Sequence, residues 1–183
     1  MKATPLAIAD VVLLEPTVFR DERGYFFESF NQRVFDAAIG RQVVYVQDNH
    51  SRSVCGVLSG LHYQLPPHAQ GKLVRVTRGK VFDVAVDIRR SSATFGRWVG
   101  AELSAENFCQ LWIPPGFAHG FVALSDEAEF LYKTTDVWVK ECDRAIRWDD
   151  AQIGIDWRLP GAVPLVAAKD RAAPLLRDAE LFA

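Results

Sequence analysis

Two segments of the sequence place histidines close to glycines, where a side chain can face a cavity. One reads Gly60-Leu61-His62-Tyr63-Gln64, and the other, residues 112–121, contains His119. A histidine titrates near neutrality, so it can move a proton or bind a metal. A catalytic metal usually has three protein ligands, and glutamine at position 64 is a poor substitute for imidazole. Two histidines are too few, so the sequence predicts proton transfer with no metal and no other cofactor.

Composition and charge narrow the class of protein. The chain has 183 residues, 49% of them hydrophobic, and we expect one domain that spans residues 1–183. A net charge of -2 is unlike that of nucleic-acid-binding domains, so no nucleic-acid partner is expected. The sequence has no apolar run of about 18 residues and no long apolar leader. These features predict no membrane partner and a cytoplasmic location.

The number and spacing of the cysteines do not favour a site built from cysteine. Cys55, Cys109 and Cys142 are odd in number and form no CxxC pair. Neither a disulfide framework nor a structural zinc site is expected.

Short strands separated by turns predict an all-β sandwich or barrel. Residues 72–88 predict a hairpin, because strand-like patterns lie on both sides of Arg78-Gly79-Lys80. Two short helices are predicted, at residues 31–39 and 171–181. Residues 157–183, rich in proline and alanine, are expected to wrap the surface. The other predicted strands are residues 11–15, 25–30, 43–48, 98–103, 110–113, 120–123, 128–135 and 145–148.

Residues 112–121 also contain the spacing Pro-x-Gly-x-x-His, formed by Pro114, Gly116 and His119. This pattern resembles the second motif of the cupin superfamily. Residues 60–64 lie where a cupin carries its His-x-His pair, with Gln64 in place of the second histidine. The resemblance implies a cupin-like jelly-roll β-barrel with a few short helices.

A closer resemblance extends from residue 21 to residue 170. Its segments, in order, are similar to those of bacterial dTDP-4-dehydrorhamnose 3,5-epimerases. The resemblance implies a dTDP-4-keto-6-deoxyhexose as the substrate, whose ketone acidifies the protons on C3 and C5. The matching segments are residues 21–30, 47–51, 60–64, 70–74, 83–87, 112–121, 132–136, 155–157 and 169–170.

The resemblance assigns a role to each group that the chemistry needs. His62 is implied as the base that removes a carbon-bound proton, and Asp170 as the partner that fixes its tautomer. Lys72 would stabilise the enolate oxygen. Tyr132 would return the proton on the opposite face, since an enolate carbon is a much stronger base than a phenolate.

The resemblance also implies a set of substrate-binding residues and a homodimer whose N-terminal strands pair across the subunits. Trp138 would stack on the pyrimidine, and Arg23 and Lys169 would meet phosphate. Arg23 and Glu28 would then serve the neighbouring subunit's site. The full set is Phe19, Arg23, Glu28, Gln47, Asn49, Ser59, His119, Trp138, Asp143 and Lys169.

One position departs from the family pattern. Relatives read Arg-Gly-Leu-His where this chain has Ser59 before Gly60, and Cys55 also stands where close relatives often carry arginine. Serine supplies no charge, so we expect weaker binding of the nucleotide sugar or a different sugar. Arg20, Arg52 and Arg75 are the arginines that could compensate.

Three other functions remain open at this point. The first is an epimerase that acts at C3 only or C5 only, with the same base and acid. The second is a cupin that binds a sugar nucleotide without turnover, although such a protein would not need the four catalytic groups. The third is a metal-dependent cupin oxygenase or isomerase, which ligand counting disfavours.

Overall fold

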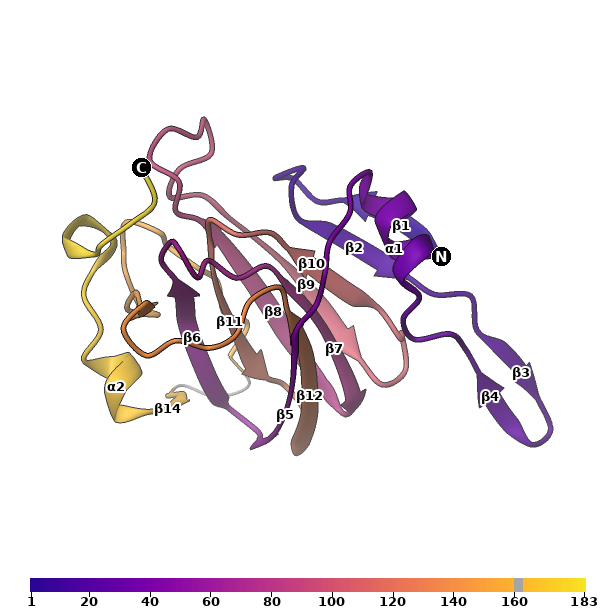
Figure 1. The fold of residues 1–183 in the computed structure, drawn as a ribbon. Coiled ribbons are helices and arrows are strands. Elements are labelled where there is room, and N and C mark those ends of the chain that lie inside the picture. Colours follow the sequence, from indigo (N-terminus) through magenta and orange to yellow (C-terminus); the bar gives the residue numbers. More distant parts are fainter. Residues whose placement is uncertain (160–162) are drawn as a thin grey trace.

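The computed structural model describes residues 1–159 and 163–183, and most of its elements are strands packed in two facing sheets (Figure 1). Sheet 1 has the strand order β1-β2-β10-β7-β12-β5. Its members are β1 (Lys2–Pro5), β2 (Val12–Glu15), β10 (Gln110–Ile113), β7 (Lys72–Arg78), β12 (Glu127–Thr134) and β5 (Gln47–Val54).

Sheet 2 has the order β13-β6-β11-β8-β9, and β14 pairs in parallel with β6. Its members are β13 (Asp143–Ala145), β6 (Val57–Gln64), β11 (Phe117–Ala123), β8 (Lys80–Asp87), β9 (Trp98–Ser104) and β14 (Leu165–Val166). Buried side chains from both sheets, such as Val74, Ala85, Phe121 and Phe130, form one apolar cluster. The two sheets therefore enclose the main core, as expected for the cupin-like jelly roll.

Further layers cover the outside of the sandwich. The C-terminal segment, which contains α2 (Ala168–Arg171) and a 3-10 helix (Leu176–Asp178), runs along sheet 2 (Figure 1). Trp157, Val166 and Leu176 bury their side chains there against strands such as β6 and β8. A third cluster packs α1 (Gln32–Ile39) on sheet 1 through Phe35 and Trp112.

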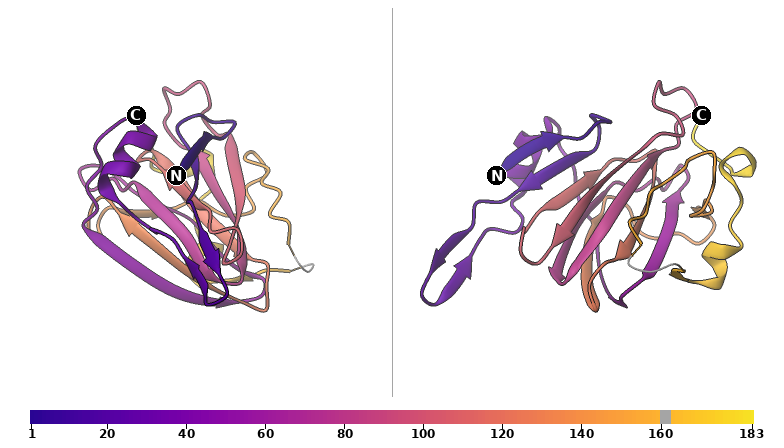
Figure 2. Two further views of the ribbon diagram at one scale, coloured as in Figure 1. Left: turned by 90° about the vertical axis from the view of Figure 1, so that its right-hand side faces the viewer. Right: turned by 180° about the vertical axis from the view of Figure 1, so that it is seen from behind.

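The hairpin that β3 (Phe19–Asp21) and β4 (Gly24–Phe26) form projects away from this body (Figure 2). Its strands pair with each other, and neither extends sheet 1 or sheet 2 within the described residues. Phe19 and Phe26 are exposed on it. The hairpin therefore presents apolar surface that the rest of the chain does not cover.

The predicted hairpin at residues 72–88 is wrong in its pairing, although both of its strands exist. β7 pairs with β10 and β12 in sheet 1, whereas β8 pairs with β11 and β9 in sheet 2. The chain thus crosses from one sheet to the other at Gly79. A period of two predicts a strand but does not name its partner, and in a jelly roll consecutive strands commonly belong to different sheets.

The two predicted helices had different outcomes. The helix at residues 31–39 is confirmed: the Asn31 side chain accepts hydrogen bonds from Arg33 N–H and Val34 N–H, and Gly40 ends the helix at φ 73°. The helix at residues 171–181 is wrong, because Pro174 disfavours helical backbone at the residue before it. Only the short helices α2 and Leu176–Asp178 form in that region.

Several strand predictions also need correction. The strand at residues 25–30 ends at Phe26, and of residues 43–48 only Gln47 and Asp48 are in a strand. The strand at 145–148 is instead β13, Asp143–Ala145. Strand β6, which carries His62, was not predicted, because glycine and polar residues interrupt its apolar pattern. No helix of the described residues is long and apolar enough to cross a membrane.

Candidate active site

A pocket of about 650 Å³ of empty space, partly open to solvent, lies at one end of the sandwich. Its walls come from both sheets, from two loops and from the short helix α2. Nine of the predicted site residues line it: Gln47, Ser59, His62, Lys72, His119, Tyr132, Trp138, Asp143 and Lys169. The lining also includes residues that the sequence analysis did not select, namely Gln70, Phe121, Phe130 and Thr134.

His62 is paired with Asp170 at the inner wall of this pocket. His62 Nε2 lies 2.7 Å from Asp170 Oδ1, and Gly60 N–H donates to Asp170 Oδ2 at 3.2 Å. Burial alone would raise the pKa of Asp170, but the bonds from His62 and Gly60 and the charge of Lys169 outweigh it and lower that pKa. Asp170 therefore stays ionised and orients the imidazole.

The close approach of β6 and β11 sets the direction in which the His62 side chain points. His62 pairs with His119 across β6 and β11, and the register shifts between His119 and Phe121. A Cβ on Gly120 would lie 2.7 Å from Ser59 O, and one on Gly60 would lie 2.6 Å from Gly120 Cα. Only glycine fits where these two neighbouring strands approach so closely, and the close approach brings both histidines to the same pocket.

Lys72 is buried in the pocket wall, and its Nζ donates to His62 O at 3.4 Å. Burial lowers the pKa of Lys72 to about 8, although Asp143 and Asp83 pull it upward. His119 Nε2 lies 2.9 Å from Asp83 Oδ2. Burial raises the pKa of Asp83 and lowers that of His119, while the contact between the two groups acts in the opposite direction on each pKa. Sequence reasoning did not select Asp83; the available signal was a carboxylate in the middle of the apolar run of β8.

Tyr132 enters the pocket from the sheet opposite to His62. It lies on β12 of sheet 1, whereas His62 and His119 lie on β6 and β11 of sheet 2. Burial, and then the charge of Asp143, raise the pKa of Tyr132. Its hydroxyl therefore keeps its proton at neutral pH and can donate it.

The mouth of the pocket is built around Trp138, whose side chain is more than half exposed. Trp138 N–H donates to Gln47 Oε1 at 2.9 Å, and Gln47 Nε2 donates to Asn49 Oδ1 at 3.0 Å. The Nδ2 group of Asn49 is buried and has no hydrogen-bond partner among the described residues. Lys169 on α2 is exposed and supplies positive charge at the same rim.

Comparison with known proteins identifies the family. The family model described as dTDP-4-dehydrorhamnose 3,5-epimerase matches residues 5–178. The chain belongs to the dTDP-4-dehydrorhamnose 3,5-epimerase family. The epimerase of Pseudomonas aeruginosa is 63% identical over 182 residues, which cover 100% of this chain and 99% of the relative. That of Shigella flexneri is 59% identical over 182 residues, with the same coverage.

A solved epimerase from Legionella pneumophila, in complex with dTDP-4-keto-L-rhamnose, superimposes with a TM-score of 0.94. It is 49% identical, and the match covers 98% of this chain and 94% of the other. The comparisons agree with the predicted family and with the jelly-roll fold. This member of the epimerase family is therefore an isomerase.

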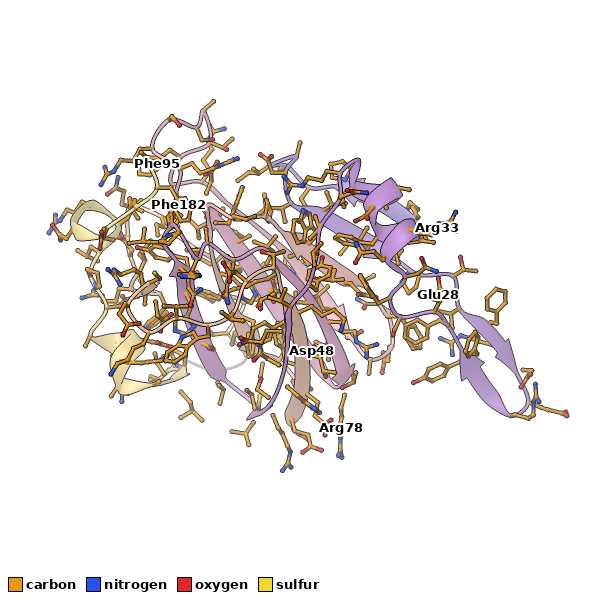
Figure 3. The ribbon with its side chains drawn as sticks, in the orientation of Figure 1. Glu28, Arg33, Asp48, Arg78, Phe95 and Phe182 are labelled. Atoms are coloured by element: carbon orange, nitrogen blue, oxygen red, sulfur yellow. The ribbon has the colours of Figure 1, made fainter. Side chains whose placement is uncertain are left out.

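Three predicted binding residues of this epimerase lie away from the pocket within the chain. Phe19 and Arg23 lie on the β3–β4 hairpin, and Glu28 follows its base (Figure 3). Arg23 forms an ion pair with Asp21, and Glu28 accepts a bond from Asn31. A single subunit does not bring them to its own His62.

Of the arginines that could replace the missing charge at Ser59, none lines the pocket within the described residues. Arg52 pairs with Glu127 at the solvent-facing side of β5, and Arg20 lies on the hairpin. Arg75 lines a separate cavity with Phe30 and Lys133. Among the residues that the structure describes, none of the arginines therefore lies at the Ser59 side of the epimerase pocket.

Proposed function

We propose that the protein inverts C3 and C5 of dTDP-4-dehydro-6-deoxy-D-glucose to give dTDP-4-dehydro-L-rhamnose, in the formation of dTDP-L-rhamnose. One observation carries this proposal: His62 and Tyr132 reach one pocket from opposite sheets. Inversion needs a base on one face of the sugar and an acid on the other, and side chains of these two types on opposite walls of one pocket support the proposal.

Each of the two inversions, at C3 and at C5, proceeds through an enolate. His62 takes the proton from C3 or C5, the C–H electron pair forms a carbon–carbon double bond, and the C4 carbonyl oxygen becomes negative. Lys72, in its protonated form, stabilises that oxygen, and His119 lies beside it in the pocket. Tyr132 then gives a proton to the opposite face, which restores the ketone with inverted configuration. Asp170 keeps His62 in the productive tautomer and supports its positive form.

The rest of the pocket suits the nucleotide. Trp138 at the mouth stacks on the thymine ring, while Lys169 attracts the diphosphate. Gln47, Asn49, Ser59 and Asp143 supply hydrogen-bonding groups around the substrate. Asn49 does not line the pocket itself and would act through Gln47, whose Nε2 donates to Asn49 Oδ1.

The functional unit in this proposal is a homodimer. Phe19 and Arg23 on the hairpin, with Glu28 at its base, complete the site of the neighbouring subunit. Exposed aromatic side chains support this arrangement: Phe19 and Phe26 are 63% and 70% exposed in the single chain. A projecting hairpin with such surface is typical of a segment that a partner covers.

The decisive experiment is solvent deuterium incorporation into dTDP-4-dehydro-6-deoxy-D-glucose, followed by proton NMR in D2O. We expect deuterium at both C3 and C5 with the wild type, none with His62→Ala, and altered incorporation with Tyr132→Phe. Unchanged exchange in His62→Ala would reject His62 as the base. Exchange at one carbon alone would show a single-position epimerase, and binding without exchange would show a sugar-nucleotide-binding protein.

A further inference from the structure

Gln64 is buried behind the pocket, and both the nitrogen and the oxygen of its side-chain amide are hydrogen-bonded to backbone atoms. It lies on β6, two residues after His62, and is 2% exposed. Its Nε2 donates to His68 O at 2.7 Å and to Val137 O at 3.1 Å, and its Oε1 accepts from Val139 N–H at 2.7 Å. Both ends of the amide are thus engaged away from the reacting sugar.

Two of these bonds hold the residues on either side of Trp138. Residues 137–139 lie outside the strands, after β12 and before β13, so no sheet ladder fixes this backbone. Trp138 itself is held through its N–H by Gln47. Gln64 and Gln47 therefore form hydrogen bonds with three consecutive residues, 137–139. Trp138, the middle one, is 55% exposed at the pocket mouth.

We propose that Gln64 is a positioning residue that holds the Trp138 loop in place and thereby sets the affinity for the nucleotide. The inference rests on the proposed function, in which Trp138 stacks on the base. An indole that is already ordered loses little conformational freedom on binding, so the stacking energy appears as affinity. Without Gln64, the loop has to be ordered when the nucleotide arrives.

Binding of dTDP to the full-length protein, measured by calorimetry, tests this proposal. Gln64→Met keeps the volume and removes all three bonds. Because each such bond contributes modestly, we expect the Kd for dTDP to rise about three- to tenfold. Trp138→Ala should raise it at least as much. The double variant should bind no more weakly than Trp138→Ala alone, because Gln64 acts through the indole.

A matched control separates this role from a general loss of stability. Ser125 also holds a loop in place, at the end of β12 opposite to Tyr132: its hydroxyl accepts from Lys80 N–H at 2.8 Å and donates to Glu127 O at 2.7 Å. Ser125→Ala should leave the Kd for dTDP unchanged. Gln64→Glu provides a second variant if Gln64→Met does not fold, since it keeps the acceptor for Val139 N–H and loses the two donors.

Kinetics give an independent readout. Gln64→Met should raise KM by the same factor as the Kd, while deuterium exchange at saturating substrate stays within about twofold of the wild type. An unchanged Kd in Gln64→Met, or effects of Gln64→Met and Trp138→Ala that simply add, would overturn the positioning role. Failure of the wild type to bind dTDP, or unchanged binding by Trp138→Ala, would instead overturn the proposed function.

Discussion

Asp170 Oδ1 lies 2.7 Å from His62 Nε2, although 108 residues separate the two in the sequence. The contact exists because the C-terminal segment packs across β6 and turns into α2 there. Asp170 is 1% exposed, and the ring of His62 is the side chain to which it is hydrogen-bonded.

Replacement of Asp170 by asparagine should slow the reaction while leaving nucleotide binding intact. An amide can hold the imidazole in the wrong tautomer and cannot stabilise its positive form, so we expect deuterium exchange to fall roughly 100-fold or more. The Kd for dTDP should stay within about twofold, since Asp170 lies behind His62 rather than at the pocket mouth. Loss of binding in parallel with exchange would contradict this role.

The pH dependence should reveal Lys72. Its pKa is lowered to about 8, and the enolate needs the protonated form. Lysine is charged below that pKa, so kcat/KM should decline as pH rises through about 8. Tyr132, whose pKa is raised, still holds its proton in this range. Lys72→Arg keeps the charge to much higher pH, so its pH profile should lose this alkaline decline. An unchanged decline in Lys72→Arg would assign it to another group.

Ser59 should limit affinity. It lines the pocket and pairs with Phe121 across β6 and β11, so an arginine there would point toward the substrate. A charge-assisted bond contributes very roughly 1.5 to 3 kcal/mol, and Ser59→Arg should therefore lower KM about tenfold or more. Ser59→Ala is the control and should change KM little. Unchanged KM and turnover in Ser59→Arg would remove the basis for weak binding or altered sugar preference.

The close approach of β6 and β11 should leave no room for a side chain at Gly120. A Cβ there would lie 2.7 Å from Ser59 O and 3.1 Å from the Trp157 ring, so Gly120→Ala must push the strands apart. We expect a loss of about 2 kcal/mol or more and a Tm lower by about 4–8 °C. Gly40→Ala, where the new Cβ meets nothing, should cost only about 1 kcal/mol for its left-handed backbone. An equal loss of stability in Gly120→Ala and Gly40→Ala would show that β6 and β11 can move apart without cost.

Mixed dimers can test whether the hairpin serves the neighbour. His62→Ala and Arg23→Ala subunits should each be poorly active alone when substrate is well below KM. When they are co-expressed with different tags, one site of each mixed dimer combines an intact His62 with the partner's intact arginine. About a quarter of wild-type sites should then return at equal expression, by counting over a two-fold dimer. No recovery in purified mixed dimers would place Arg23 in its own subunit's site.

The sequence predicted many of the residues that line the pocket, but not the strand pairing that brings them together. His62 and His119 could be found because their glycine-rich surroundings and spacing are local features. Asp83 and Gln64 could not be assigned in the same way, because their roles depend on which strands become neighbours. The error at residues 72–88 has the same origin: alternation predicts β7 and β8 but not that they belong to opposite sheets. Pro174, by contrast, was a local signal against the helix at residues 171–181.

The apolar cluster between the sheets also acts as a spacer for the reaction. Phe121 and Phe130, whose rings stack 4.3 Å apart, line the pocket and belong to that cluster. In the proposed reaction His62 on β6 and Tyr132 on β12 act from opposite sheets, so the thickness of this aromatic layer would set how far the proton donor stands from the carbon that receives the proton. A change in ring size at Phe121 or Phe130 would alter the distance between the two sheets at the pocket. It would thereby change which carbon of the sugar is reached, without altering any group that carries a proton.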